Sequence, residues 1–144
     1  MSEPINISFR IKNISTLEFS IRNIQLDQTF DKDQFPIQIS LGTQIDPLNK
    51  FISVDTFVNI FADPENKNKI CGLTTRVVYE VENLQSTVVV EGNNIKIPDT
   101  FMTTLISIAL STTRGILTAK TEGTLLHDVF MPIVNPTSFK PTDK

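Results

Sequence analysis

The sequence is poor in the residues from which most active sites and crosslinks are built. Its 144 residues include one cysteine, Cys71, one histidine, His127, and no tryptophan. A single cysteine excludes an internal disulfide and fits a reducing compartment. A Ser–His–Asp triad or a histidine metal site would have to use His127, and no nucleophile-elbow pattern or second ligand cluster accompanies it. We therefore interpret Cys71 as a small packed hydrophobe and His127 as a surface residue.

Glycine and basic charge are also scarce. Five glycines form no Gly-x-x-x-x-Gly-Lys or Gly-x-Gly-x-x-Gly pattern, so no nucleotide cradle is visible. The 13 Lys and Arg are scattered and outnumbered by 16 Asp and Glu, which argues against nucleic acid as a partner. We expect no catalytic site, no metal and no cofactor.

Long apolar runs are missing as well. None approaches the roughly 18–20 residues of a membrane span. The N-terminal residues Met-Ser-Glu-Pro-Ile-Asn have neither the basic nor the apolar region of a signal peptide. We therefore expect a cytoplasmic protein without membrane insertion.

What is present is enough apolar material for one domain. The chain is 40 % hydrophobic and 20 % charged, the balance of a folded rather than a disordered protein. We assign residues 1–139 to a single domain and 140–144 to a disordered tail.

Apolar periodicity predicts four strands followed by a helix. Period-two alternation occurs in residues 5–21, with a break near 12–15, and in residues 37–46, 51–61 and 70–82. The short turn at 63–66 predicts that the last two strands pair antiparallel. From residue 98 to about 119 the spacing becomes helical, with Asp99 or Thr100 as the expected cap, and residues 125–134 are expected to lie extended over the domain. The predicted class is α+β.

The chain has more phenylalanine than so small a core needs. Phe30 and Phe35 lie in a polar loop, and Phe51, Phe57 and Phe61 lie opposite the aliphatic face of their strand. Large exposed apolar patches usually mark binding surfaces, so we predict that these five residues contact a polypeptide. The alternative is that they are core residues, completed by oligomerisation.

Several segments, in the same order along the chain, resemble the SecB-type protein-export chaperones. The pattern Phe-x-Ile-x-x-Ile begins at Phe9, and residues 30–36, Phe-Asp-Lys-Asp-Gln-Phe-Pro, are similar to the family's crossover segment. Ile70-Cys71 resembles its aliphatic-Cys pair. Ser-Thr-Thr-Arg-Gly at 111–115 resembles the end of its long helix, and Pro-Ile-Val-Asn at 132–135 resembles its Pro-Val-Asn.

This resemblance implies a particular fold and activity. It implies a four-stranded antiparallel sheet packed with a long helix, assembled as a dimer of dimers. It also implies binding of non-native polypeptide without ATP, in apolar grooves lined by the aromatics of the crossover segment, here Phe30 and Phe35.

The chain departs from the family where the translocation motor SecA docks. Of three acidic positions, Glu18 matches one, whereas Arg22 reverses the charge of the second and Gly72 replaces the third. Because charge reversal at a charged interface lowers on-rate and specificity, we predict weak or no SecA binding. The resemblance also leads us to expect that the family's final helix is missing after Phe139.

Three hypotheses follow for the function. The first is a SecB-like chaperone or adaptor for non-native polypeptide, serving export or a dedicated client such as the antitoxin of a toxin–antitoxin pair. The second is a structural or assembly protein whose apolar surface is buried in subunit contacts. The third is a small-molecule carrier with an enclosed cavity between sheet and helix.

Overall fold

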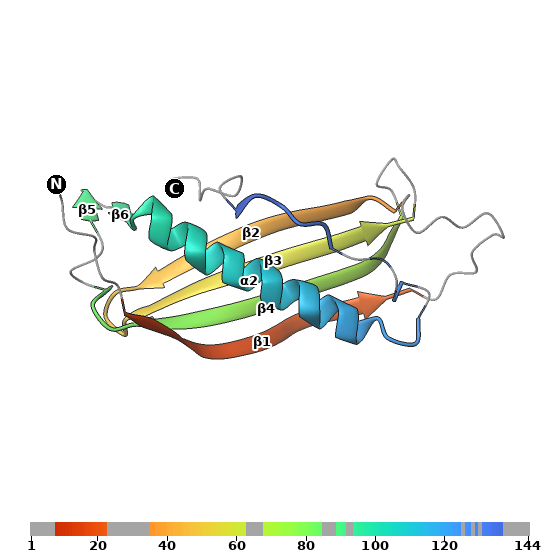
Figure 1. Cartoon of the computed structure of the whole chain (residues 1–144), viewed down its shortest axis with the longest axis horizontal. Helices are drawn as coiled ribbons and strands as arrows, with labels where there is room; N and C mark the ends of the chain where they lie inside the picture. Colours follow the sequence, from red (N-terminus) through yellow and green to blue (C-terminus); the bar gives the residue numbers. More distant parts are fainter. Residues whose placement is uncertain are drawn as a thin grey trace.

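The structure, a computed structural model, consists of a four-stranded sheet crossed on one face by a long helix (Figure 1). It describes residues 8–22, 35–62, 68–84, 89–91, 94–124, 126–127, 129 and 131–136. The four strands are β1 (Phe9–Ile21), β2 (Ile37–Asp46), β3 (Phe51–Phe61) and β4 (Lys69–Val81). Neighbouring strands pair antiparallel in the order β1-β4-β3-β2, which leaves β1 and β2 at the edges. The prediction of an α+β fold with an antiparallel four-stranded sheet is confirmed.

The bounds of the central strands follow the period-two pattern closely. β2 and β3 coincide with the predicted segments, and β4 begins and ends one residue earlier than predicted. A short hairpin of β5 (Val89–Glu91) and β6 (Asn94–Lys96) was not predicted, because three residues carry too little alternation. The predicted start of the first strand, at Ile5, lies outside the described residues.

The inner face of the sheet, which faces the helix, carries the core. Every second side chain is buried along β3 as far as Ile60 and along β4 from Leu73 onward, as alternation requires. The helix α2 (Asp99–Lys120) buries a matching stripe at helical spacing, including Phe101, Leu105, Ala109 and Leu117. Core burial therefore fixes which sheet face is inner and which is outer.

Buried hydroxyl groups join the helix to the sheet within this core. The Tyr79 hydroxyl donates to the carbonyl of Leu105 at 2.7 Å. The Thr113 hydroxyl donates to the Ala109 carbonyl and lies 2.7 Å from the Thr75 hydroxyl. Because Thr113 has a single hydroxyl proton, Thr75 must be the donor to Thr113. These directional bonds fix the position of α2 on β4.

The start of α2 corrects the predicted cap. The N-cap position is Pro98, and no side chain caps the helix. The backbone N–H groups of Phe101 and Met102 both bond to the Pro98 carbonyl, so the cap lies one residue before Asp99 and two before Thr100. Proline suits this place because it has no N–H to leave unpaired.

The chain after the helix is only partly extended, which corrects the prediction for 125–134. Turn bonds run from the His127 N–H to the Thr124 carbonyl and from the Val129 N–H to the Leu126 carbonyl. Residues 131–135 have no regular secondary structure. We call residues 131–136 the 131–136 segment; it lies along α2 on the β2 side (Figure 1).

Candidate functional site

The predicted aromatic set does not share one surface. Phe30 lies outside the described residues. Phe35 is half-buried and packs against the core at the start of β2, and Phe61 is 9 % exposed. Phe51 and Phe57 lie on the outer face, because their neighbours Ile52 and Val58 point into the core. Four of the five residues are therefore divided among the outer face, the interior and one end of the sheet.

On the outer face, the centre is occupied by an ion pair rather than by apolar side chains. Asp55 and Arg76 are directly paired residues of β3 and β4, and both guanidinium–carboxylate contacts are short, at 2.8 and 2.9 Å. Bonding to Asp55 raises the pKa of Arg76 above its ordinary value. A bidentate pair of this kind holds the two side chains flat on the sheet.

Next to this pair, an open depression of about 620 Å³ lies on the outer face. The apolar residues Ile45, Pro47, Leu48, Phe51 and Val78 line it together with Gln44, Asp46, Ser53 and Arg76. It opens to solvent, and it is not the enclosed cavity between sheet and helix that a small-molecule carrier requires.

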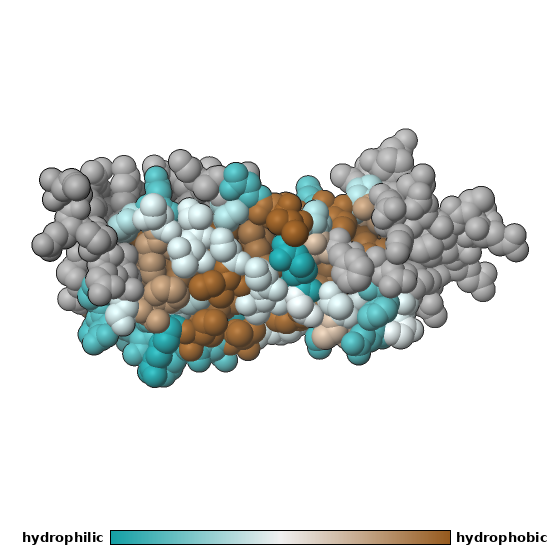
Figure 2. Space-filling model, viewed as in Figure 1, coloured by the Kyte–Doolittle hydropathy of each residue, from teal (hydrophilic) through white to brown (hydrophobic). Residues whose placement is uncertain are grey.

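An exposed apolar stripe on β1 was missed by the sequence analysis. We call Ile11, Ile14 and Leu17 the β1 stripe; they are 45, 43 and 47 % exposed. Ile11 and Ile14 pair with Tyr79 and Val77, whose side chains are buried under the helix, so both face the inner side of the sheet. Figure 2 shows the resulting apolar surface over β1, beside the paler band of α2.

The stripe is exposed because α2 covers the middle of the sheet more fully than its β1 edge. Phe9 and Phe19, at the two ends of β1, pack against the core instead. The Phe9 ring meets the Phe101 ring edge-on with centroids 5.2 Å apart. The amine of Lys120 lies 5.9 Å from the centroid of Phe19. Large aliphatic side chains three residues apart, at Ile11, Ile14 and Leu17, were the signal that could have been read.

The three positions predicted from the SecA-docking resemblance do share a surface. Glu18 pairs with Thr74, and Gly72 pairs with Ser20, all on the outer face. The Arg22 N–H bonds to the Ile70 carbonyl at the end of the same strand pair. A Cβ at Gly72 would lie 3.2 Å from the Ser20 hydroxyl, 3.3 Å from the Lys69 amine nitrogen and 3.5 Å from the Asn59 amide oxygen, so one basic group lies beside this position.

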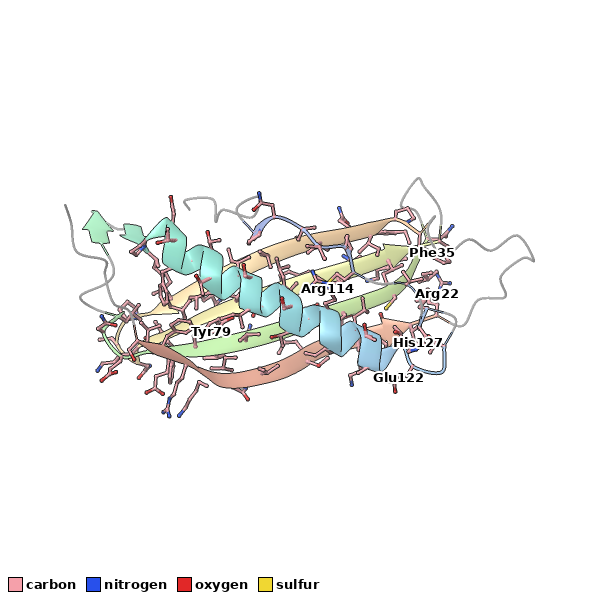
Figure 3. All side chains as sticks on the ribbon, in the orientation of Figure 1. Arg22, Phe35, Tyr79, Arg114, Glu122 and His127 are labelled. Atoms are coloured by element: carbon pink, nitrogen blue, oxygen red, sulfur yellow. The ribbon has the colours of Figure 1, made fainter. Side chains whose placement is uncertain are left out.

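On the other flank of the helix, α2 contacts the 131–136 segment. Arg114 donates from Nε to the Met131 carbonyl and from a terminal nitrogen to the Pro132 carbonyl, both at 3.2 Å. In Figure 3 its side chain lies between α2 and the 131–136 segment. Met131 is 2 % exposed and Ile133 is 91 % exposed, so the segment has an inward and an outward side.

The described part of the chain offers little chemistry of other kinds. Burial raises the pKa of Cys71 to about 11, so its thiol is protonated at neutral pH, as expected for a packed residue. His127 is exposed, as predicted. Among the described residues, no three His, Cys, Asp or Glu side chains are grouped as metal ligands would be. No helix in these ranges is both long and apolar enough to span a membrane.

Comparison with known proteins supports the fold. No family model matches the sequence, and no curated protein matches it. Among solved structures, the chain is similar to the Mycobacterium tuberculosis Rv1957 SecB-like chaperone in complex with a ChAD peptide from the Rv1956 HigA1 antitoxin. The TM-score is 0.52 at 11 % identity, over 88 % of this chain and 89 % of the other. The chain therefore has a SecB-like fold, and at this identity the likeness concerns the fold alone.

Proposed function

We propose that this chain is an ATP-independent chaperone or adaptor that binds non-native polypeptide in the cytoplasm, as a homo-oligomer. The single observation that carries the proposal is the β1 stripe, in which Ile11, Ile14 and Leu17 remain accessible beside α2. The fold likeness to a chaperone with a bound antitoxin peptide supports it.

The physical reason is the undemanding nature of apolar recognition. A client segment gains free energy roughly in proportion to the apolar area it buries, whatever its sequence. Ile11 and Ile14 on the inner side of an edge strand, with Leu17 exposed at the following register shift, offer apolar side chains to an extended chain, which presents its own side chains alternately. Phe35 and Phe30 belong to the same proposal as aromatics of the crossover segment, whereas Phe51 and Phe57 would require a separate contact on the outer face and Phe61 is buried.

A dedicated client fits the outer face better than general export does. Of the three positions that resemble the docking patch, only Glu18 is acidic, and the Lys69 amine lies near Gly72. We therefore expect weak or no binding of SecA, and a client such as an antitoxin at least as readily as an exported precursor. A pull-down with SecA in low salt tests this, since screening is then weakest.

The decisive test is suppression of aggregation of an unfolding model protein. We expect the wild type to suppress aggregation at several-fold excess, and an Ile11→Ser/Leu17→Ser variant to lose most of that effect. Phe30→Ala and Phe35→Ala test the crossover residues in the same assay. Leu48→Ser is the matched control, because Leu48 is 87 % exposed but lies on the hairpin between β2 and β3. A wild type that suppresses nothing would refute general chaperoning.

The second candidate is an assembly protein that buries the β1 stripe between subunits. The observation that favours it is the self-complementarity of β1. Antiparallel pairing of two copies about Ile14 would set Arg10 opposite Glu18 twice. Ile14→Lys would then place like charges face to face and disperse the oligomer in sedimentation. If this variant stays oligomeric, β1 is not the contact; if it becomes monomeric and still suppresses aggregation, assembly is not the function of the stripe.

A further inference from the structure

The 131–136 segment lies on the domain as a bound peptide would. Its residues 131–135 belong to no regular helix or strand. It runs beside α2 on the helix-facing side of the sheet, toward β2 (Figure 1). Met131 is buried and Val134 packs against the core, while Pro132 and Ile133 are exposed.

Two of the contacts that hold this segment, the bonds from Arg114, do not depend on its sequence. Arg114 bonds to two successive main-chain carbonyls, at Met131 and Pro132, and every residue type offers such a carbonyl. The guanidinium is always charged and presents its donors in a fixed plane, which suits two adjacent acceptors. The apolar contacts come from Met131 and Val134, two side chains three residues apart. Many unfolded chains carry apolar side chains at that spacing.

We propose that the strip between α2 and β2 is a polypeptide-binding subsite, which the 131–136 segment fills until a client segment replaces it. This inference rests on the proposed function and names a place and a residue for it. Arg114 is the backbone-binding residue, passing from the Met131 and Pro132 carbonyls to two carbonyls of the client. The ligand class is an extended segment with aliphatic residues three apart.

Competition of this kind has a measurable consequence. A segment tethered to its own site acts at a high effective concentration, so it lowers the apparent affinity for any external chain. Loosening the tethered segment must therefore strengthen external binding, whereas ordinary damage to a binding site weakens it. An increase in affinity for the external chain therefore indicates displacement of the segment, and a decrease indicates damage to the binding site.

The test compares two aliphatic residues that are neighbours in the segment. Val134→Ser removes a side chain packed on the core, and Ile133→Ser removes one that is 91 % exposed. The probes are a labelled peptide with the sequence of residues 126–136 and a reduced, carboxymethylated model protein, which stays unfolded. We expect Val134→Ser to bind both probes about fivefold more tightly than wild type, and Ile133→Ser to equal wild type. Val134→Ala serves the same purpose if the serine variant does not fold.

The role of Arg114 is tested in the loosened background. Adding Arg114→Gln to Val134→Ser should weaken peptide binding several-fold, because the external chain loses the same two bonds. Equal affinities for wild type and all variants that bind would overturn the subsite and leave the proposed function standing. If no variant binds the unfolded protein but Val134→Ser still gains affinity for the peptide, the subsite stands and the proposed function falls.

Discussion

The buried hydroxyl chain between β4 and α2 gives the sharpest prediction about stability. The Thr75 hydroxyl donates to the Thr113 hydroxyl, which donates to the Ala109 carbonyl. Both threonines are 0 % exposed. Thr113→Val removes the hydroxyl oxygen that accepts the hydrogen bond from the buried Thr75 hydroxyl. Thr75→Val removes a donor and leaves the bond from Thr113 to Ala109 intact. The two substitutions change similar volumes, so any difference between them reports the hydrogen bonds.

The size of the difference follows from leaving a buried group unpaired. An ordinary net hydrogen bond contributes about 1 kcal/mol, whereas a buried donor left without an acceptor costs about 1–3 kcal/mol. We expect Thr113→Val to lower the free energy of unfolding by roughly 2 kcal/mol and Thr75→Val by roughly 1 kcal/mol. The double variant should be no worse than Thr113→Val alone, since replacing both partners by apolar groups removes the unpaired donor.

Chemical denaturation of the three variants and wild type, followed by circular dichroism, measures these differences. The slope of the unfolding free energy with denaturant must stay constant for the comparison to hold. Additive losses in the double variant would refute the reasoning, because they would show two independent bonds rather than a chain. The result bears on function, since the same bonds fix the helix between the β1 stripe and the 131–136 segment.

Two further predictions concern the thiol and two glycines. Burial raises the pKa of Cys71 from 9.0 to about 11, so the unfolded chain loses the thiol proton at a lower pH than the folded protein does. The free energy of unfolding should therefore be unaffected below pH 9, fall as the pH rises toward 11, and be lower by roughly 1.4 kcal/mol at pH 10. Cys71→Ala should flatten that decline. No flattening in pH-dependent melts would show that another group is responsible. Gly123 has φ +79° whereas Gly115 lies inside α2, and an added Cβ meets nothing within 4 Å at either position. Gly123→Ala should therefore cost about 1 kcal/mol and Gly115→Ala should gain up to about 1 kcal/mol in unfolding free energy; equal effects would contradict the backbone argument.

The central strands β3 and β4 were predictable because each pairs with a strand on both sides and buries one face, so apolar and polar residues alternate along it. In β3 and β4 a shift by one residue would turn Val54 or Val77 to solvent, so the apolar pattern specifies the face. The helix was predictable for the same reason, from apolar residues at a period near 3.6. These signals are local, and they were confirmed.

The edge strand was harder, because its backbone departs from the ideal twice. The pairing of β1 with β4 shifts between Ile11 and Asn13 and again between Thr16 and Glu18. The predicted break near 12–15 corresponds to the first shift only. Two bulges return Phe19 to the face of Phe9, as the period suggested, but they also bring Ile14 to that face, which simple alternation does not predict. The exposure of the β1 stripe depends on how much of the sheet α2 covers, and this is decided by tertiary packing rather than by the local sequence.

The aromatic site was harder still, because phenylalanine content says nothing about direction. Phe51 and Phe57 were placed correctly opposite the aliphatic face, yet the opposite face turns out to be the outer one, centred on Asp55 and Arg76. Phe61 falls at the register shift after Ile60 and is buried. Whether a strand's second apolar face meets a partner depends on what the rest of the chain covers.

The two flanks of α2 are therefore in different conditions, and the difference bears on how a client would bind. On the β1 flank, Ile11, Ile14 and Leu17 stay in contact with water. On the β2 flank, the chain covers the sheet with its own extended segment, using Met131 and Val134 as a client would use its apolar residues. A client that engages the open flank first needs no displacement, and its further residues can then compete for the occupied flank at high effective concentration. Long clients should consequently gain more from loosening the 131–136 segment than short peptides do, because only a chain that reaches both flanks profits from the second.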